Sequence, residues 1–594
     1  FRPMTAVLGI SAFFHDSAAC LVQDGVIVAA ASEERFTRRK GDAAFPAQAA
    51  AWCLEQGGLT ANALDAVAFY EKPILHLDRL FESWLHTAPR GWRAFLKGGP
   101  LWARDKIDLD GAIRRGLNGY TGKLLWCEHH ESHAASAFFP SPFAEAAVLT
   151  IDGVGEWATA TMGVGSGASL RLTHELRYPD SLGLLYSACT YHAGFRVNSG
   201  EYKLMGLAPF GTPRYLDLML RELIDLRDDG SFRLHRAPFG FVDGLRMTTA
   251  HFDALFDGPP RVPESPITQR DMDLAASVQQ LTEIIVQRMV RSVVRETGVR
   301  DLCMAGGVAL NAVANGTLKR EKLVDRLWVQ PAAGDAGGAL GAALLAWHRY
   351  FGGARHHDSD DAAMPDTMHG ALLGPSFSDE AIGAALAEQG AVAETLGRDG
   401  VVQRTAECLA TGGIVGWFDG PMEFGPRALG ARSILADPRK LDMQARLNAH
   451  IKLRENFRPF APAVLAERAH EYFDGIEGDE SPYMLQVVPV RVGAPPLPAI
   501  THCDGSARVQ TVTAARTPGL RAVLDAFAAR TGCPVLVNTS FNIRGEPVVH
   551  TPADAYACLM RTDIDALAIG PYFVLRTAQP SVGDARWHVM LEPD

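Results

Sequence analysis

Two segments about 140 residues apart repeat one pattern of strands and turns. Residues 7–31 read as a strand, a polar turn, a second strand, a tight turn and a third strand, and the chain from residue 148 begins in the same way. In register, these positions coincide: Leu8 with Leu149, Ile10 with Ile151, Ser11 with Asp152, and Ala19 with Ala160. The repeat predicts an α/β domain built by duplication, and chance alternation of apolar residues is the alternative.

The turn after the first strand of each unit is polar, so its backbone N–H groups can hold a phosphate. Much later, an apolar strand over residues 302–305 leads into a Gly-Gly turn and a helix. Paired strand units with a late Gly-Gly turn for adenosine are typical of the superfamily of actin, sugar kinases and heat-shock chaperone ATPases. The candidate nucleotide-binding residues are Ser11, Asp16, Gly306, Gly307 and Asn311.

A histidine-rich segment at residues 129–133 suggests a metal site. His129 and His133 are four residues apart, so they share one face of a helix. Asp152 follows a buried strand, and Asp335 lies in a glycine-rich turn before an alanine-rich helix. Two histidines with carboxylates suit Fe(II), Zn or Mn, and Asp335 could instead hold Mg-ATP. The alternative is a helix with solvated histidines and ordinary aspartates.

Bulk properties indicate a multidomain enzyme. A chain of 594 residues is too long for one core, and we expect domains at 1–355 and 372–594 joined by a polar linker at 356–371. The net charge of -11 argues against nucleic acid as the main partner. The nine cysteines form no CxxC pair, and neither a membrane span nor a signal peptide is apparent, so we expect a cytoplasmic protein.

The second domain carries basic residues next to Gly, Pro or Asn turns, where guanidinium and ammonium groups can hold anions. These are Arg427, Lys452, Arg454, Arg458 and Arg544, with Ser540 and Asn542 after a buried strand. In the first domain, residues 200–211 read as a loop over a ligand and carry Lys203. For each residue the alternative is a solvated surface position.

Ten segments spread in order over nearly the whole chain resemble the NodU/CmcH family of O-carbamoyltransferases. They read LGISAFFHDSAA, ASEERFTRRK, HHESHAASAFF, TIDGVGEW, SGEYKLMGLAPFG, AGGVALN, GDAGGALGAAL, MEFGPRALGARSILADPR, KLRENFRPFAP and NTSFNIRGEP. The chain length and the turn at residues 15–18 resemble the branch that carbamoylates aminoglycosides such as tobramycin.

The resemblance implies an actin-type N-terminal domain similar to the tRNA threonylcarbamoyladenosine synthase, with iron held by His129, His133, Asp152 and Asp335. It also implies a YrdC-like C-terminal domain, a twisted α/β sheet that makes a carbamoyl-adenylate. The expected partners are carbamoyl phosphate, ATP with Mg²⁺, and a hydroxylated small molecule, with an aminoglycoside favoured. No membrane is expected as a partner, and the oligomeric state is left open.

The expected mechanism uses both domains. Arg427, Lys452 and Arg544 would neutralise phosphate charge while the adenylate forms, and an acceptor hydroxyl would then attack it near the metal. His15 is the candidate general base, although a donor to substrate or phosphate fits nearly as well. The alternative functions are a sugar-kinase or chaperone-like ATPase and a tRNA threonylcarbamoylation enzyme.

Overall fold

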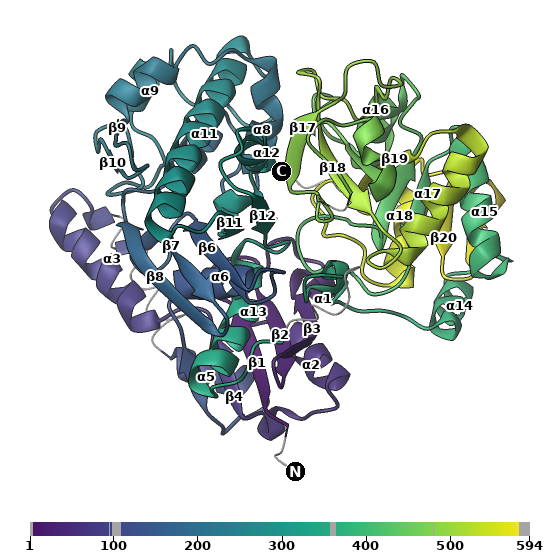
Figure 1. The fold of residues 1–594 in the computed structure, drawn as a ribbon, viewed down its shortest axis with the longest axis horizontal. Coiled ribbons are helices and arrows are strands. Elements are labelled where there is room, and N and C mark those ends of the chain that lie inside the picture. Colours follow the sequence, from purple (N-terminus) through teal and green to yellow (C-terminus); the bar gives the residue numbers. More distant parts are fainter. Residues whose placement is uncertain (1–3, 94–95, 98–107, 357–363, 479, 581–594) are drawn as a thin grey trace.

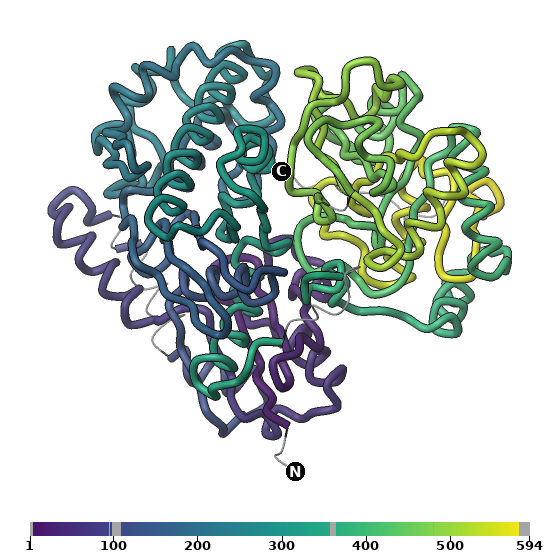
Figure 2. The backbone as a smooth tube through the Cα atoms, viewed as in Figure 1, coloured from purple at the N-terminus to yellow at the C-terminus, as the bar shows by residue number. Residues whose placement is uncertain are grey.

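The structure is a computed structural model that describes residues 4–93, 96–97, 108–356, 364–478 and 480–580. Figure 1 shows two halves side by side, one formed by the N-terminal part of the chain and one by the C-terminal part. The backbone trace in Figure 2 follows the same division. Among the described residues, no helix is both long and apolar enough to cross a membrane.

Two five-stranded sheets form the frame of the N-terminal half. The first has the order β3-β2-β1-β4-β5, with β1 (Ala6–Ser11), β2 (Ala18–Gln23), β3 (Val26–Ser32), β4 (Ala66–Phe69) and β5 (Leu124–Trp126). The second has the order β8-β7-β6-β11-β12, with β6 (Glu145–Ile151), β7 (Ala158–Ser166), β8 (Ser169–Arg177), β11 (Asp301–Ala305) and β12 (Arg326–Val329). In the first sheet, β1, β2 and β3 pair antiparallel, and β4 and β5 run parallel to β1. In the second sheet, β6, β7 and β8 pair antiparallel, and β11 and β12 run parallel to β6.

The register of the strands confirms the duplication. Ile10 pairs with Ala19 in the first sheet, and Ile151 pairs with Ala160 in the second. These are the equivalences that the sequence repeat predicts. The prediction of a duplicated α/β fold is therefore confirmed at the level of single residues.

Two helices lie between the sheets and touch each other. Helix α13 (Asp335–Leu345) packs on β1 and β2, whereas α6 (His129–Phe138) packs on β6 and β11. Their contact is very close, because a Cβ added at Gly341 would lie 1.7 Å from the carbonyl oxygen of Ser132. On the outer faces, α2 (Ala47–Gln56) covers β2 and β3, and α11 (Gln269–Thr297) contacts β6 and β7.

Shorter elements complete the N-terminal half. They are α1 (Glu34–Thr37), α3 (Pro73–Thr87), α5 (Leu109–Gly116), α7 (Leu182–His192), α8 (Glu201–Leu207), α9 (Leu216–Glu222), β9 (Ile224–Leu226), β10 (Phe232–Leu234), α10 (Ala250–Leu255) and α12 (Ala312–Arg320). Helix α1 lies where the two halves face each other (Figure 1).

The C-terminal half is built on a nine-stranded sheet of order β13-β21-β20-β14-β15-β19-β16-β18-β17. Its strands are β13 (Glu394–Thr395), β14 (Val415–Phe418), β15 (Arg432–Ala436), β16 (Ala461–Leu465), β17 (Gln486–Pro489), β18 (Ser506–Val512), β19 (Val535–Ser540), β20 (Ala566–Ile569) and β21 (Tyr572–Leu575). Its helices are α14 (Asp379–Glu388), α15 (Gly397–Ala410), α16 (Met443–Arg446), α17 (Pro518–Thr531) and α18 (Pro552–Arg561). The mixed α/β class predicted for this part is confirmed.

The two halves pack tightly against each other. Strand β17 lies on α12, where a Cβ added at Gly316 would be 1.9 Å from the carbonyl oxygen of Val487. The connection between the halves is also fixed: the Ala30 N–H donates to the Leu373 carbonyl at 3.0 Å, and Asp366 pairs with Arg516 at 2.8 Å. Residues 357–363 of the predicted linker lie outside the described residues, and the domain boundaries stay a prediction.

Replacing Gly341 by alanine should separate α6 from α13. The new methyl group has no room against the Ser132 carbonyl, so we expect the free energy of unfolding to fall by about 1–3 kcal/mol. Thermal denaturation measures this loss. Gly206→Ala is the control, because there a new Cβ would meet only Pro459 at 3.9 Å; equal effects of the two substitutions would contradict the packing argument.

Candidate functional site

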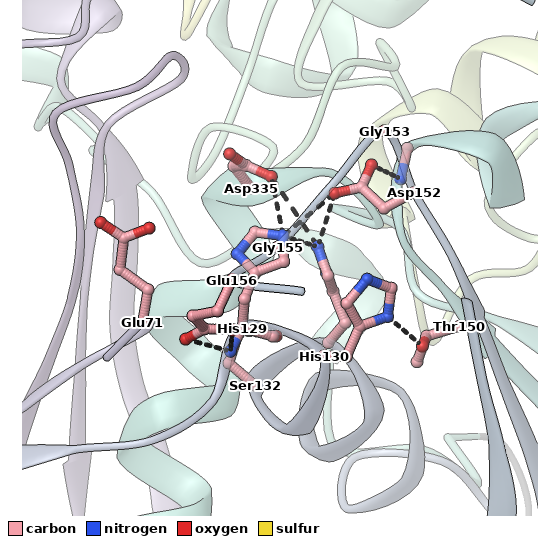
Figure 3. Close-up of polar contacts among 12 residues, drawn as sticks. Glu71, His129, His130, Ser132, Thr150, Asp152, Gly153, Gly155, Glu156 and Asp335 are labelled. Atoms are coloured by element: carbon pink, nitrogen blue, oxygen red, sulfur yellow. Dashed lines mark hydrogen bonds and ion pairs between the residues drawn. The ribbon is translucent and has the colours of Figure 1, made fainter. Parts of the chain in front are cut away.

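Four predicted metal ligands converge between the two sheets of the N-terminal half. Their donor atoms, one each from His129, His133, Asp152 and Asp335, all lie within 4.8 Å of one another. His129 Nε2 is 3.0 Å from His133 Nε2 and 3.0 Å from Asp152 Oδ2, and it is 3.7 Å from Asp335 Oδ1. Figure 3 shows the imidazole of His129 between the two carboxylates.

The cluster fits a metal ion by its spacing and its charge. Ligands about 2.1 Å from a tetrahedral ion are about 3.4 Å apart, close to the separations observed here. Asp335 Oδ2 is buried and has no hydrogen-bond partner among the described residues. A divalent cation would compensate the negative charge of two carboxylates this close together. The side chains suit Fe(II), Zn or Mn equally, so they do not select the metal.

Local hydrogen bonds fix the ligand-bearing backbone. Helix α6 begins with a capping box between Glu128 and Glu131, and the buried carboxylate of Glu156 accepts the His129 N–H at 3.0 Å. The Gly307 N–H donates to Asp152 Oδ1 at 2.9 Å, which leaves Asp152 Oδ2 facing the histidines. The residues that orient the cluster therefore come from segments far apart in the sequence (Figure 3).

The histidines and carboxylates of the cluster shift one another's pKa values. Burial lowers the pKa of His129, but Asp335 and Asp152 outweigh burial and raise it to about 9. Burial alone would raise the pKa of Asp152, yet its hydrogen bonds to His129 and His133 hold it well below its usual range.

The first predicted phosphate turn lies beside the cluster. His15 Nε2 is 3.8 Å from Asp335 Oδ2, and His15 Nδ1 is 3.1 Å from Asp16 Oδ2. Burial lowers the pKa of His15, but Asp335 and Asp16 outweigh burial and raise it to about 10. Asp16 faces the open cavity described below, whereas Ser11 is fully buried at the end of β1.

The predicted adenosine turn follows β11, but its polar groups are engaged within the protein. Gly306 has a φ of 91° and approaches the Ile151 carbonyl closely, and Gly307 holds Asp152. The Asn311 side chain caps α12 through the Ala314 N–H and also bonds Gln279. None of the three lines the cavity.

A cavity of about 1880 Å³ extends between the two halves. Described residues from both halves line it, including His15 and Asp16 at one side and the predicted anion-binding residues at the other. The lining contains eleven arginine and lysine side chains and five carboxylates. In a chain of net charge -11, this concentration of positive charge marks the cavity as a site for anions.

Lys452 organises the C-terminal wall of the cavity. Its buried ammonium donates to Ser540 Oγ at 3.1 Å and to Asn542 Oδ1 at 2.8 Å, and it also contacts the Ser540 and Asn542 carbonyls. Burial and the nearby Arg454 lower the pKa of Lys452 well below its usual range. The three residues predicted as separate anion ligands are therefore one hydrogen-bonded unit.

Further arginines face the same space. The Nε atoms of Arg427 and Arg508 are buried and have no hydrogen-bond partner among the described residues. Burial and the positive charge of Arg427 lower the pKa of Arg508. Arg458 lies over the Tyr202 ring at 4.8 Å, and Arg454 lies over Phe460 at 4.8 Å. Such crowded guanidinium groups are stabilised when phosphate enters.

Two predicted ligands occupy different surroundings from those expected. The segment around Lys203 is helix α8 rather than a loop, and its ammonium is buried 3.4 Å from Glu455 of the C-terminal half. Leu204 and Leu207, which follow Lys203, pack inward and stabilise a helix despite the glycines nearby. Arg544 lines the cavity, but its Nη2 also donates to Glu264 at 2.6 Å.

Several of the residues that line the cavity are not identified from the sequence. Arg508 lies in β18 without a motif around it, whereas Arg35, Arg38, Arg39 and Lys40 belong to the family segment ASEERFTRRK, in which no site residue is predicted from the sequence. Only the tertiary contact between halves brings this run to the cavity. The family segment ASEERFTRRK, with its basic residues in an acidic chain, is the sequence signal that could have marked it.

Comparisons with known families match both halves. Residues 6–344 match the family described as Carbamoyltransferase N-terminus, and residues 406–576 match Carbamoyltransferase C-terminus. An uncharacterised protein of Synechocystis sp. is 50% identical over 100% of both chains. The nodulation protein NolNO of Sinorhizobium fredii is 38% identical over 96% of this chain and 80% of its own. NolO of Bradyrhizobium diazoefficiens is 39% identical over 75% of this chain and 78% of its own.

Solved structures are more distant. HypF from T. kodakarensis is 14% identical, with a TM-score of 0.32 over 59% of this chain and 49% of its own. Component A of the Acidaminococcus fermentans (R)-2-hydroxyglutaryl-CoA dehydratase is 15% identical, with a TM-score of 0.30 over 58% of this chain and 98% of its own. Scores this low add nothing to the fold assignment, which rests on the strand order.

Removing one ligand should abolish metal binding. We expect the wild-type protein to hold about one equivalent of metal, and His133→Ala to hold less than a tenth of that, because the remaining donors no longer enclose the ion. Elemental analysis of purified protein measures the content. His130→Gln is the matched control, since His130 lies on the same helix but bonds Thr150; equal metal in all three proteins would refute the site.

Proposed function

The chain belongs to the carbamoyltransferase family, and we propose that it is an ATP-dependent O-carbamoyltransferase. In this proposal, it uses carbamoyl phosphate to modify a hydroxyl group of a small molecule. The observation that carries the proposal is the basic cavity between the two halves. The Lys452 unit lies at one side of it, and the His15 turn lies at the other, beside the predicted metal cluster. Carbamoyl phosphate and ATP are both anions, which this cavity suits.

The first reaction of the proposal takes place at the C-terminal wall. Water releases phosphate from carbamoyl phosphate, and the resulting carbamate oxygen attacks the α-phosphorus of ATP, so pyrophosphate leaves and a carbamoyl-adenylate forms. The arginines around Arg427 and Arg508 would hold the phosphates and stabilise the charge that develops on them. Ser540 and Asn542, fixed by Lys452, would orient the carbamoyl group.

The second reaction takes place at the N-terminal side. The acceptor hydroxyl attacks the carbamoyl carbon, the bond to the phosphate oxygen breaks, and AMP leaves with the proton removed from the hydroxyl. His129, His133, Asp152 and Asp335 would hold a cation that acts as a Lewis acid. His15 and Asp16 lie where they could hold the acceptor or its phosphate-bearing partner.

The acceptor proposed is a polyhydroxylated small molecule, and an aminoglycoside is the specific candidate. The half-exposed carboxylate of Asp16 next to His15 supports a cationic acceptor at that place. The rest of the cavity is basic and would repel a polycation, so an aminoglycoside would have to enter beside Asp16.

The other two functions have less support. A sugar kinase or chaperone-like ATPase would need neither the cluster of two histidines and two aspartates nor the arginines in the second half. A tRNA threonylcarbamoylation enzyme would have to bind RNA with an acidic chain.

A product assay tests the proposal. With carbamoyl phosphate and ATP alone, we expect pyrophosphate, phosphate and little AMP; adding tobramycin should give AMP and a carbamate on the aminoglycoside, seen by mass spectrometry. Pyrophosphate without a carbamoylated product would keep the chemistry and reject this acceptor. ADP as the nucleotide product would reject the adenylate mechanism and favour a kinase.

Arg508→Gln should weaken anion binding without changing the metal site. Losing one charge-assisted contact should raise the KM of carbamoyl phosphate or ATP by about 10–100-fold, measured by pyrophosphate release. Arg171→Gln serves as the control, because that arginine lies in β8, away from the cavity. An unchanged KM for both anions in Arg508→Gln would remove this residue from the proposed site.

A further inference from the structure

The short helix α1 of the N-terminal half reaches directly into the C-terminal half. It ends at Arg38, whose φ of 59° is unusual for a residue with a side chain. Arg38 Nη1 donates to the Val548 carbonyl at 2.6 Å, and Nη2 donates to the Pro547 carbonyl at 2.9 Å. Phe36, two residues earlier, meets His550 edge-on at 4.7 Å between ring centres.

The Pro547 and Val548 carbonyls, which accept these bonds, lie at the end of the loop that forms the proposed anion site. This loop follows β19, whose last residue is Ser540, and it carries Asn542 and Arg544; all three residues lie within seven residues of Pro547. Its near end is held by Lys452, as described above. At its far end, the two partly buried carbonyls take their donors from a guanidinium of the other half of the molecule. Without Arg38 they would lose these partners, at a cost in stability of the loop.

A neighbouring contact ties the second anion-binding loop to the same helix. Arg35 Nη2 donates to the Gly425 carbonyl at 3.2 Å, two residues before Arg427. Gly425 has a φ of 131°, and a Cβ there would lie 2.8 Å from the carbonyl of Pro331. Pro331 in turn precedes Asp335 by four residues, so this loop also touches the segment that leads to the metal cluster.

We propose that Arg38 is a positioning residue that holds the 543–548 loop in the conformation needed to bind carbamoyl phosphate and ATP. The identity of the ligands in this inference rests on the proposed function. The geometry of the loop rests on the hydrogen bonds of Arg38 instead. It implies that the anion site in the C-terminal half is complete only when the N-terminal half is docked against it.

Hydrogen–deuterium exchange of the full-length protein without ligands tests the positioning directly. In Arg38→Ala, we expect amides of residues 541–550 to exchange at least about tenfold faster, while peptides of α6 and α13 are unchanged. Arg38→Lys keeps one donor and should restore part of the protection. Unchanged exchange at 541–550, or faster exchange spread over the whole protein, would overturn the proposal.

Arg288→Ala is the matched control. Arg288 also donates to a backbone carbonyl, that of Arg227 at 2.9 Å, and it too lies 3.7 Å from a carboxylate, that of Asp228. The corresponding carboxylate at Arg38 is Asp554, also at 3.7 Å. The control therefore removes the same kind of contact from an exposed face of α11, and protection at 541–550 should remain as in the wild type.

Kinetics supply the second readout. In Arg38→Ala, the KM of carbamoyl phosphate in acceptor-independent pyrophosphate release should rise about tenfold or more, with metal content unchanged. A fall in kcat with unchanged KM would overturn the positioning role. If the wild-type protein releases no pyrophosphate, the proposed function fails, and the exchange experiment still decides the role of Arg38.

Discussion

The contact between α6 and α13 determines whether a metal site can exist in this fold. Helix α6 contributes His129 and His133, and α13 contributes Asp335. The two helices pack on different sheets. Close approach of the two helices, tightest at Gly341, brings their ends within ligand distance. Backbone packing, rather than the donors themselves, therefore sets the size of the ion that the cluster can enclose.

In the cavity between the two halves, electrostatic repulsion works against the packing of the side chains. Arginine and lysine side chains are gathered there against their mutual repulsion, and burial removes the water that would screen them. Contacts with uncharged groups hold these cations in place. Examples are Arg458 over the Tyr202 ring and the Lys452 bonds to Ser540 and Asn542. Phosphate groups bound in this cavity would relieve the repulsion.

The sequence predicts much of the N-terminal half because its signals are local or repeated. The register of Ile10 and Ile151 follows from period-two alternation, and the pairing of His129 with His133 follows from the helical period. The position of Lys203 in a helix, the engagement of Asn311 by Gln279, and the approach of Arg38 to Pro547 depend on tertiary contacts. No local pattern encodes these contacts, since each joins residues that are far apart in the chain.

The segment that joins the two halves bonds to both of them. Leu373 accepts a hydrogen bond from Ala30 at the edge of β3, and Asp366 is held by Arg516 and Tyr483. The apolar core of the N-terminal half also includes Leu429, Ala461 and Leu485 from beyond that segment. Unfolding either half would expose core surface of the other. Heat or denaturant should therefore melt the whole molecule in one cooperative transition, although a chain of this length would ordinarily unfold domain by domain.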